Sequence, residues 1–406
     1  MSGSLKHYLR SRGALFAEFT ADVIYDRAEG TAATVYGILL EMLSWIFTAI
    51  VKIRFFLYDN RLFRDTPLGC KVVVVGNLTV GGTGKTPVVE KMARSLAKRG
   101  RKVAILSRGY KSKTDSLPTK LRRWFLQGTK PDPAVVSDGK KILLDCHIAG
   151  DEPYMLARNL LPEGVVVIVN RDRVEAGAFA LRKYGVDTII LDDGLQYLPL
   201  RGQINLLLVD KNNPFGNRSL LPRGILREPV KHLRRGSYIF ITKSDGKPDP
   251  VLRAEIEKYK HRRAGVIECA HRPKCLRTID HAVEHPLSFL QGKRVASFSG
   301  IATPESFEAF LRQNGAQIVY NRRFLDHHWF DKEDIEEVLD GARGVGAELV
   351  LTTEKDAVRL PVDLRTDIPL LYLRLEVEIL DAHDTFDAAV ERIVFDNTPI
   401  TGMVLR

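Results

Sequence analysis

The sequence predicts an α/β protein with a mostly parallel sheet, in which a second, smaller α/β domain follows the main one and an apolar helix precedes both. Two observations predict this fold class. Apolar runs of strand length alternate with segments of helical pattern from Pro67 onward, as in folds built from β-α-β units. One long apolar stretch stands before them, near the N-terminus.

Length and composition set the limits. A chain of 406 residues is too long for one small hydrophobic core, which favours at least two domains. With 45% hydrophobic and 27% charged residues it has the composition of a folded protein. The net charge of +11 fits a nucleic acid, an anionic membrane surface or a phosphorylated substrate, and does not decide among them. None of the four cysteines forms a C-x-x-C pair, so neither a zinc framework nor a disulfide scaffold is expected.

The apolar stretch "VYGILLEMLSWIFTAIVKI" covers Val35 to Ile53 and has the length of a helix that crosses a bilayer. Glu41 and Lys52 interrupt it, so two interpretations remain. One is an amphipathic helix that packs on the main domain. The other is a membrane anchor, with the basic and aromatic segment "KIRFFLYDNRLFR" on its cytoplasmic side, where anionic lipid attracts Lys and Arg.

The main domain begins after Pro67. Its first apolar run, "KVVVVGN", is continuous, which is typical of a strand buried on both faces. The segment "TPVVEKMARSLAKRG" predicts a helix that ends at Gly100. Further strands, separated by helices or loops, are predicted over residues 102–109, 165–172, 186–194, 204–210 and 237–245.

A glycine-rich turn joins that first strand to that helix, in the stretch "VVVVGNLTVGGTGKTP". This order of strand, turn and helix predicts a phosphate-binding loop, in which backbone N–H groups face phosphate oxygens and Lys85 reaches the β- and γ-phosphates. Thr79 stands where the general P-loop pattern has its first Gly. The nucleotide-binding residues expected from this loop are Thr79, Val80, Gly81, Gly82, Thr83, Gly84, Lys85 and Thr86.

A second signal is "TIILDD", a predicted strand that ends in two carboxylates, Asp192 and Asp193. Ligands of parallel α/β sheets bind at the carboxyl ends of the strands, so these side chains are expected beside the phosphate loop. Together with the Thr86 hydroxyl they indicate a P-loop NTPase core that binds a nucleotide with Mg²⁺.

The helix-strand pattern breaks around residues 260–295, where turns, short strands and a linker are expected. A second α/β unit follows, with strands predicted over 294–301, 316–324 and 347–356 and helices over 304–315 and 331–344. We therefore expect three parts. They are an N-terminal membrane-associated helical segment (1–66), a P-loop core (67–290) and a C-terminal α/β domain that closes over the active site (291–406).

Two groups of P-loop proteins fit the loop. One is the partitioning and metallochaperone group, a P-loop GTPase or ATPase switch whose K-G-G-x-G-K-T motif has Lys where this chain has Val80. The "ITKSD" segment, with Lys243 and Asp245, is similar to a guanine-reading loop and taken alone would favour a GTPase. The missing Lys and the apolar N-terminal helix count against this group.

The other group is the tetraacyldisaccharide 4'-kinase family, which the chain resembles over most of its length. Thr or Ser is common at the Thr79 position in that family, and Tyr197 stands where the family usually has His. The blocks that carry the resemblance occur in family order: "VGNLTVGGTGKTP", "LSRGY", "AGDEPYMLA", "NRDRVEA", "LDDGLQ", "LLPRGILREP", "FLDHHWF" and "TTEKDAVRL".

The resemblance implies an ATP-dependent lipid kinase, a phosphotransferase with an alcohol acceptor. Its expected reaction phosphorylates the 4'-hydroxyl of a tetraacyldisaccharide 1-phosphate to form lipid IV-A in lipid A biosynthesis. The expected cofactors are ATP and Mg²⁺, and the expected location is the cytoplasmic face of the bacterial inner membrane. A monomer without a nucleic-acid partner is expected.

The resemblance also implies residue roles. Asp151 and His327 are expected to act as a pair that accepts the proton of the 4'-hydroxyl, and Lys85 to assist transfer. The "TTEKD" segment either contacts the nucleotide or caps a helix through its Thr. The expected Mg²⁺ ligands are Thr86, Asp192, Asp193 and Glu228, and the expected ligands of substrate or γ-phosphate are Arg108, Arg171, Arg173 and Arg227.

Overall fold

The computed structural model describes residues 16, 18–109, 132–280, 283–301, 303–326, 328–361, 364–380 and 383–395. They group into two compact units. Unit 1 combines Met1–Lys85, Thr188–Ala270 and Ile379–Arg406, and unit 2 combines Thr86–Asp187 and His271–Glu378. The three-part division expected from the sequence remains a prediction.

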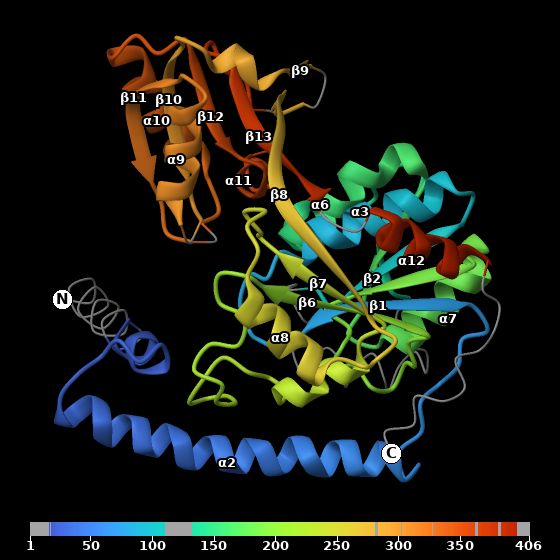
Figure 1. Ribbon diagram of the computed structural model, residues 1–406. Coiled ribbons are helices and arrows are strands. Elements are labelled where there is room, and N and C mark those ends of the chain that lie inside the picture. The colour runs from blue at the N-terminus through green and yellow to red at the C-terminus, as the bar shows by residue number, and fades with distance from the viewer. Residues whose placement is uncertain are drawn as a thin grey trace, which may run out of the picture. The chain divides into compact units, whose positions relative to one another are not determined.

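Unit 1 is a parallel sheet in the order β8-β7-β6-β1-β5, with helix α2 (Thr31–Asp59) lying along one side of it (Figure 1). Helices α8 (Pro250–Tyr259) and α12 (His383–Phe395) also belong to this unit. Its strands are β1 (Lys71–Asn77), β5 (Thr188–Asp192), β6 (Ile204–Asp210), β7 (Tyr238–Thr242) and the first part of β8 (Gly265–Thr278).

The strands of unit 1 are buried because their sequences are almost continuously apolar. Every residue of β1 after Lys71 is buried, and so is every residue of β5. Val73 of β1 pairs with Ile190 of β5 on one side and Ile204 of β6 on the other, both in parallel. The carboxyl ends of neighbouring strands therefore meet at one edge of the sheet, which is where the polar side chains follow.

Unit 2 begins with α3 (Lys85–Lys98), apart from its first residue, and contains two groups of strands. In the first, β2 (Val103–Ser107) pairs in parallel with β4 (Val166–Val169), and β3 (Ala134–Asp138) pairs antiparallel with β4. The helices of this part are α5 (Cys146–Ala149), α6 (Asp151–Leu160) and α7 (Arg173–Tyr184).

The second group of unit 2 is the parallel sheet β11-β10-β12-β13. The short strand β9 (Glu284–His285) pairs antiparallel with the end of β8. The elements of this second group, in chain order, are β10 (Arg294–Ser299), α9 (Pro304–Gln313), β11 (Gln317–Arg323), α10 (Lys332–Gly344), β12 (Leu349–Thr353), α11 (Glu354–Ala357) and β13 (Leu370–Ile379).

The mostly parallel α/β fold expected from the sequence is confirmed, and each predicted strand has its counterpart within a few residues. The predicted break around residues 260–295 is wrong, because it contains the 14-residue strand β8. Polar and apolar residues alternate irregularly in β8, and Pro273 lies within it, so it lacks the continuous apolar pattern of the other strands. Strand β13 and helix α12 were not predicted.

A buried ionic cluster joins four elements of unit 2, α3, α6, α11 and β13. Arg374 of β13 is 2% exposed and donates to both oxygens of Glu354, at 2.7 and 2.8 Å, and also to Glu90 of α3. Asn159 of α6 donates to the same two carboxylates. Burial raises the pKa of Glu354, while the charge of Arg374 acts in the opposite direction. The packing of α3, α6 and β13 therefore depends on one guanidinium.

We expect Arg374→Met to lower the free energy of unfolding by about 3–5 kcal/mol, because two carboxylates remain buried without their cation. The exposed pair Arg272–Glu378 provides the control, and Arg272→Met should cost less than about 1 kcal/mol. Urea-induced unfolding of the full chain measures both. Equal losses for the two variants would contradict this account of the cluster.

Candidate functional site

The phosphate loop leaves β1 at Asn77 and reaches α3 at Lys85. Gly81 and Gly84 have φ values of 104° and 76°, in the region that favours glycine. The segment around Ile225 and Leu226 fixes the loop from outside: the Val80 N–H donates to the Ile225 carbonyl at 2.7 Å, and Thr79 forms an isolated bridge with Leu226. The loop is thus a shaped backbone cradle and not a simple connection.

Thr79 has a structural explanation. Asn77 is fully buried, and its side-chain amide donates to both the carbonyl and the hydroxyl oxygen of Thr79, at 2.9 and 3.0 Å. Glycine at this position would retain the carbonyl but lose the hydroxyl. Farther along the loop, the Thr242 hydroxyl at the end of β7 donates to the Thr83 carbonyl at 2.8 Å. The departure from the general pattern therefore adds a hydrogen bond that holds the loop.

Two cations meet at the carboxyl ends of β1 and β5. The Lys85 ammonium lies 3.2 Å from Asn77 Oδ1 and 3.7 Å from Asp193 Oδ1. Arg227 donates to both oxygens of Asp193, at 2.8 and 2.9 Å, and to the Asn77 carbonyl at 3.1 Å. Asp193 itself has a φ of 50°, an unusual conformation for a non-glycine residue, which is often found at functional sites. We call Asn77, Lys85, Asp193 and Arg227 the loop cluster.

The loop cluster carries two positive charges and one negative charge, so it has a surplus of positive charge beside the loop's backbone N–H groups. Such an arrangement attracts phosphate. Asp192, at the end of β5, and Thr86, in the first turn of α3, are both buried. The structure thus places the expected residues Lys85, Asp193 and Arg227 together.

Glu228 lies next to Arg227 and is 2% exposed. Gln196 donates to its Oε1 at 3.0 Å, while His232 Nδ1, at 2.8 Å, and Arg235 contact its Oε2. Burial alone would raise the pKa of Glu228, but the hydrogen bond to His232 and the charge of Arg235 outweigh it, so the pKa is lowered. Glu228 is therefore an ionised carboxylate whose two oxygens are both held. We call Gln196, Glu228, His232 and Arg235 the glutamate cluster.

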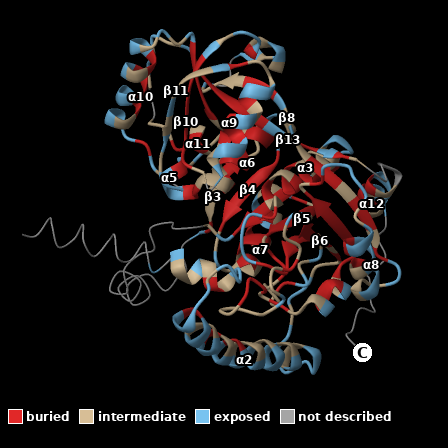
Figure 2. Cartoon of the chain, turned by 60° about the vertical axis from the view of Figure 1, so that its left-hand side comes forward, coloured by how far each residue is buried: buried red, intermediate tan, exposed pale blue. Residues whose placement is uncertain are grey.

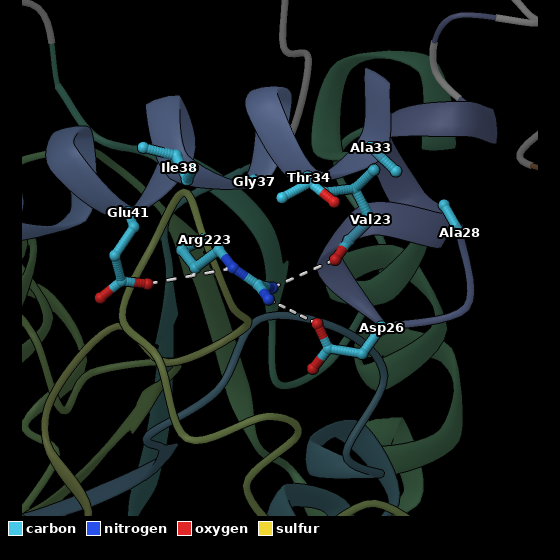
Figure 3. Close-up of a pocket in the computed structure, with 9 residues that line it drawn as sticks. All are labelled: Val23, Asp26, Ala28, Ala33, Thr34, Gly37, Ile38, Glu41 and Arg223. Carbon is cyan, nitrogen blue, oxygen red and sulfur yellow. Dashed lines mark hydrogen bonds and ion pairs between the residues drawn. The ribbon is translucent and has the colours of Figure 1, made fainter. Parts of the chain in front are cut away.

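The loop that precedes Arg227 is tied to the N-terminal helices. Arg223 donates to Asp26 and, at 3.1 Å, to the Val23 carbonyl, and it lies 3.9 Å from Glu41 of α2 (Figure 3). The Ser44 hydroxyl of α2 donates to the Leu220 carbonyl at 2.9 Å. A cavity of about 390 Å³ lies between these elements, lined in part by Arg223. It does not include the phosphate loop.

Asp151 is the first residue of α6 in unit 2. Arg359, whose side chain is 1% exposed, donates to its carboxylate and also to Asp356. His327 lies outside the described residues. Its neighbour His328 has a structural environment, because its Nε2 lies 2.7 Å from Asp334 Oδ2 and its ring stacks on Phe324.

The remaining expected arginines lie in unit 2. Arg108 follows β2 and Arg171 follows β4, and both are exposed. The Asn170 N–H donates to the Ser107 carbonyl at 3.1 Å, so the two arginines leave the sheet at the same edge. Arg173 is buried in the first turn of α7.

Sequence reasoning gave no role to several residues of these clusters. Asn77 and Gln196 lie inside sequence segments that carry the family resemblance, so the sequence did indicate that they could have a functional role. Arg359 lies inside the segment "TTEKDAVRL", but its pairing with Asp151 is visible only in the fold. His232 and Arg235 lie outside these segments, four and seven residues after Glu228. Thr353 caps α11, as one of the two interpretations of "TTEKD" predicted.

Comparison with known proteins decides the family. A profile of the tetraacyldisaccharide-1-P 4'-kinase family, LpxK, matches residues 36–394. The chain belongs to this family. A tetraacyldisaccharide 4'-kinase of Syntrophus aciditrophicus is 35% identical over 352 residues, which cover 85% of this chain and 90% of that protein. Another, from Anaeromyxobacter sp. strain K, is 38% identical over 351 residues, with 85% and 87% covered.

A solved LpxK structure supports the same conclusion for the fold. The Aquifex aeolicus protein, crystallised in complex with ATP, superposes with a TM-score of 0.67 at 28% identity. The match covers 86% of this chain and 97% of that one. The resemblance to the tetraacyldisaccharide 4'-kinase family that the sequence motifs carry is therefore confirmed.

We expect Lys85→Ala to lower turnover by about 100- to 1,000-fold, since a cation aimed at the transferring phosphoryl group is lost. Lys98→Ala is the matched control, because Lys98 is an exposed lysine in the last turn of the same helix. Steady-state kinetics with ATP measures both variants. Near-normal turnover of Lys85→Ala would contradict the role given to this loop.

Proposed function

We propose that this chain transfers the γ-phosphoryl group of ATP to the 4'-hydroxyl of a tetraacyldisaccharide 1-phosphate and so forms lipid IV-A in lipid A biosynthesis. The observation that carries the proposal is the loop cluster. In a chain that belongs to the tetraacyldisaccharide 4'-kinase family, Lys85 and Arg227 converge beside a glycine-rich phosphate loop. The Aquifex aeolicus relative was crystallised with ATP, which supports ATP as the donor.

The alternative, a P-loop GTPase or ATPase switch of the partitioning or metallochaperone type, is not favoured. Its signature Lys is replaced by Val80. The relatives that match 85% of the chain are named as kinases. Lys243, which suggested a guanine-reading loop, pairs with Asp210 at 2.6 Å.

The donor set of the site fits Mg²⁺. Mg²⁺ prefers oxygen ligands and usually takes one or two carboxylates together with substrate phosphates. Asp192 and Asp193 end a strand at the sheet edge beside the phosphate loop, and the Thr86 hydroxyl follows Lys85 directly. Bound there, Mg²⁺ would neutralise charge that develops on the phosphoryl oxygens. Because both oxygens of Asp193 and both oxygens of Glu228 are already held by other side chains, we assign these two residues to water-mediated contact with the metal.

The protein's own groups then have separate tasks. Loop N–H groups from Thr79 to Thr86 hold the triphosphate, and Lys85 with Arg227 neutralises the transferring group. Asp193 keeps these two cations in place by pairing with both. Arg108 and Arg171, which leave the sheet of unit 2 at one edge, and the buried Arg173 at the start of α7 bind phosphate of the lipid or the nucleotide.

The acceptor hydroxyl is a weak nucleophile and needs a proton acceptor, which typically contributes about 10²–10⁴-fold. We assign this task to His327, with Asp151 fixing the imidazole orientation. The ion pair with Arg359 gives Asp151 a fixed direction at the start of α6. His328 is already bound to Asp334, which favours His327 over its neighbour.

The test of the function is a product assay. The full chain is incubated with γ-labelled ATP, Mg²⁺ and detergent-solubilised disaccharide 1-phosphate, and the position of the label is determined. We expect label at the 4'-position and slower transfer from GTP. ATP hydrolysis that is unaffected by the lipid, with no labelled lipid, would instead support the switch alternative.

For the base, we expect Asp151→Ala and His327→Ala to lose turnover but keep ATP affinity, and the double variant to be no slower than the worse single one. His328→Ala should retain most activity, because its contacts are with Asp334 and Phe324. Turnover and ATP binding are measured separately. Normal turnover in His327→Ala with loss in His328→Ala would move the assignment by one residue.

The lipid substrate requires access to a membrane, and α2 has the surface for it. It is a 29-residue helix that contains an 18-residue stretch of mean hydropathy 1.8, long and apolar enough to cross a membrane by length and composition. Exposed residues follow α2 along its length (Figure 2), and most of those between Val35 and Phe56 are apolar, with Lys52 and Arg54 as exposed charges. Small or polar residues such as Gly37, Ser44 and Thr48 are less exposed. The exposed apolar residues are Val35, Ile38, Leu39, Met42, Leu43, Trp45, Ile46, Ile50, Ile53 and Phe56.

We infer that α2 lies on the cytoplasmic face of the inner membrane and does not cross it. Glu41, Ser44 and Phe55 all contact other parts of unit 1, over a length of about 21 Å at 1.5 Å per residue. Crossing the bilayer would break these contacts. If α2 lies flat on the membrane, its outward side is buried in lipid and its contacts with the rest of unit 1 are kept. A monomer is sufficient for this arrangement, and we assign the net charge of +11 to attraction by anionic lipid, with no nucleic-acid partner.

We expect the double variant Ile46→Glu/Ile50→Glu to sediment less with vesicles of anionic phospholipid, because charge on the outward side opposes burial in lipid. Val251→Glu is the control, since Val251 is a highly exposed apolar residue on α8. Both proteins should keep their ATP affinity. Unchanged sedimentation of the double variant would contradict the orientation proposed for α2.

A further inference from the structure

One turn of α2 touches every residue that hydrogen-bonds Glu228 within the glutamate cluster. The ring of Phe55 meets the ring of His232 edge-on at 4.6 Å between centroids, and the Arg235 guanidinium lies 4.9 Å from the centre of the same Phe55 ring. Arg54 donates to the carbonyl of Gln196 at 2.7 Å. The C-terminal part of α2 therefore contacts all three residues whose side chains fix one carboxylate.

These contacts restrain groups that are otherwise mobile. Arg235 has many rotamers, and its cation–π contact with Phe55 selects one in which it reaches both Glu228 and the Leu195 carbonyl. The edge contact with Phe55 fixes the His232 ring in the same way. Gln196 links Glu228 to the loop cluster, since its amide donates to both Glu228 and the Asn77 carbonyl.

We propose that Arg54 and Phe55 are positioning residues for Glu228, so that the seating of α2 on unit 1 sets the rate of phosphoryl transfer. The proposal rests on the kinase function proposed above. One side of α2 faces lipid, and the C-terminal part of its other side contacts the glutamate cluster. A movement of α2 away from unit 1 would therefore change the position of Glu228 through Phe55. Membrane docking and catalysis then share one helix.

The neighbouring phenylalanine supplies a matched control. Phe55 faces the glutamate cluster, whereas Phe56 is on the outward side and 59% exposed. With detergent-solubilised substrate, Phe55→Ala should lower kcat about tenfold and leave the KM for lipid within about twofold, as expected for a residue that acts on the transfer step. Phe55→Tyr keeps the ring and should retain more than half of the activity. Phe56→Ala should keep kcat in detergent and bind vesicles less.

A double-mutant cycle tests whether Phe55 acts through Glu228. Glu228→Gln and the double variant Phe55→Ala/Glu228→Gln should be equally slow, because Phe55 has no carboxylate left to position once Glu228 is replaced. Losses that multiply would overturn the proposal, and so would an equal loss of kcat in Phe56→Ala. If Phe55→Ala does not fold, Phe55→Leu, which keeps the apolar volume and removes the ring, replaces it in the same cycle.

Binding of ATP gives a readout that is independent of lipid turnover. Calorimetry on the full chain should show that Phe55→Ala weakens ATP binding in Mg²⁺ buffer and leaves it unchanged in buffer without Mg²⁺. Equal weakening in both buffers would contradict the proposal. If the wild-type protein transfers no phosphate to lipid, the proposed function fails, while this comparison still tests the role of Phe55.

Discussion

Two cations, Lys85 and Arg227, share one carboxylate, Asp193, at the carboxyl end of a buried parallel sheet, and the site depends on that arrangement. Lys85 comes from the phosphate loop, Asp193 from the end of β5 and Arg227 from a later loop. Asn77 closes the group by accepting from both cations. Like charges held this near to one another repel, and Asp193 with Asn77 offsets the repulsion. The arrangement leaves a positive surplus where a phosphate group would complete the balance.

The parallel sheet determines where Lys85, Asp193 and Arg227 meet. Because β1, β5 and β6 are parallel neighbours, their polar termini leave at one edge, and the buried apolar strands behind them hold those termini still. The loop that carries Arg227 and Glu228 is fixed from two directions: the backbone of Ile225 binds the phosphate loop, and Arg223 binds the N-terminal helices. Helix α2 and the phosphate loop thus both contact a single segment of the chain.

The sequence predicts the features that depend on local patterns. Continuous apolar runs predicted the parallel strands, and glycine spacing with Lys85 predicted the phosphate loop. It could not predict contacts between distant residues. The ion pair of Asp151 with Arg359 joins positions 208 residues apart, and Gln196 reaches Glu228 from a position 32 residues earlier in the chain. Strand β8 was missed because its irregular alternation resembles that of a loop. The general P-loop pattern did not explain Thr79 either, since its reason is the buried side chain of Asn77.

The most direct test of the central claim is the affinity for ATP, measured by calorimetry on Arg227→Met. If Arg227 and Lys85 together form the phosphate-binding group, the affinity should fall by about tenfold or more, because a charge-assisted contact is lost. Arg218→Met is the matched control, since Arg218 lies in the same loop, is largely exposed and pairs with Glu255. It should bind ATP as the wild-type protein does. Unchanged affinity in Arg227→Met would contradict the assignment of this cluster to the nucleotide phosphates.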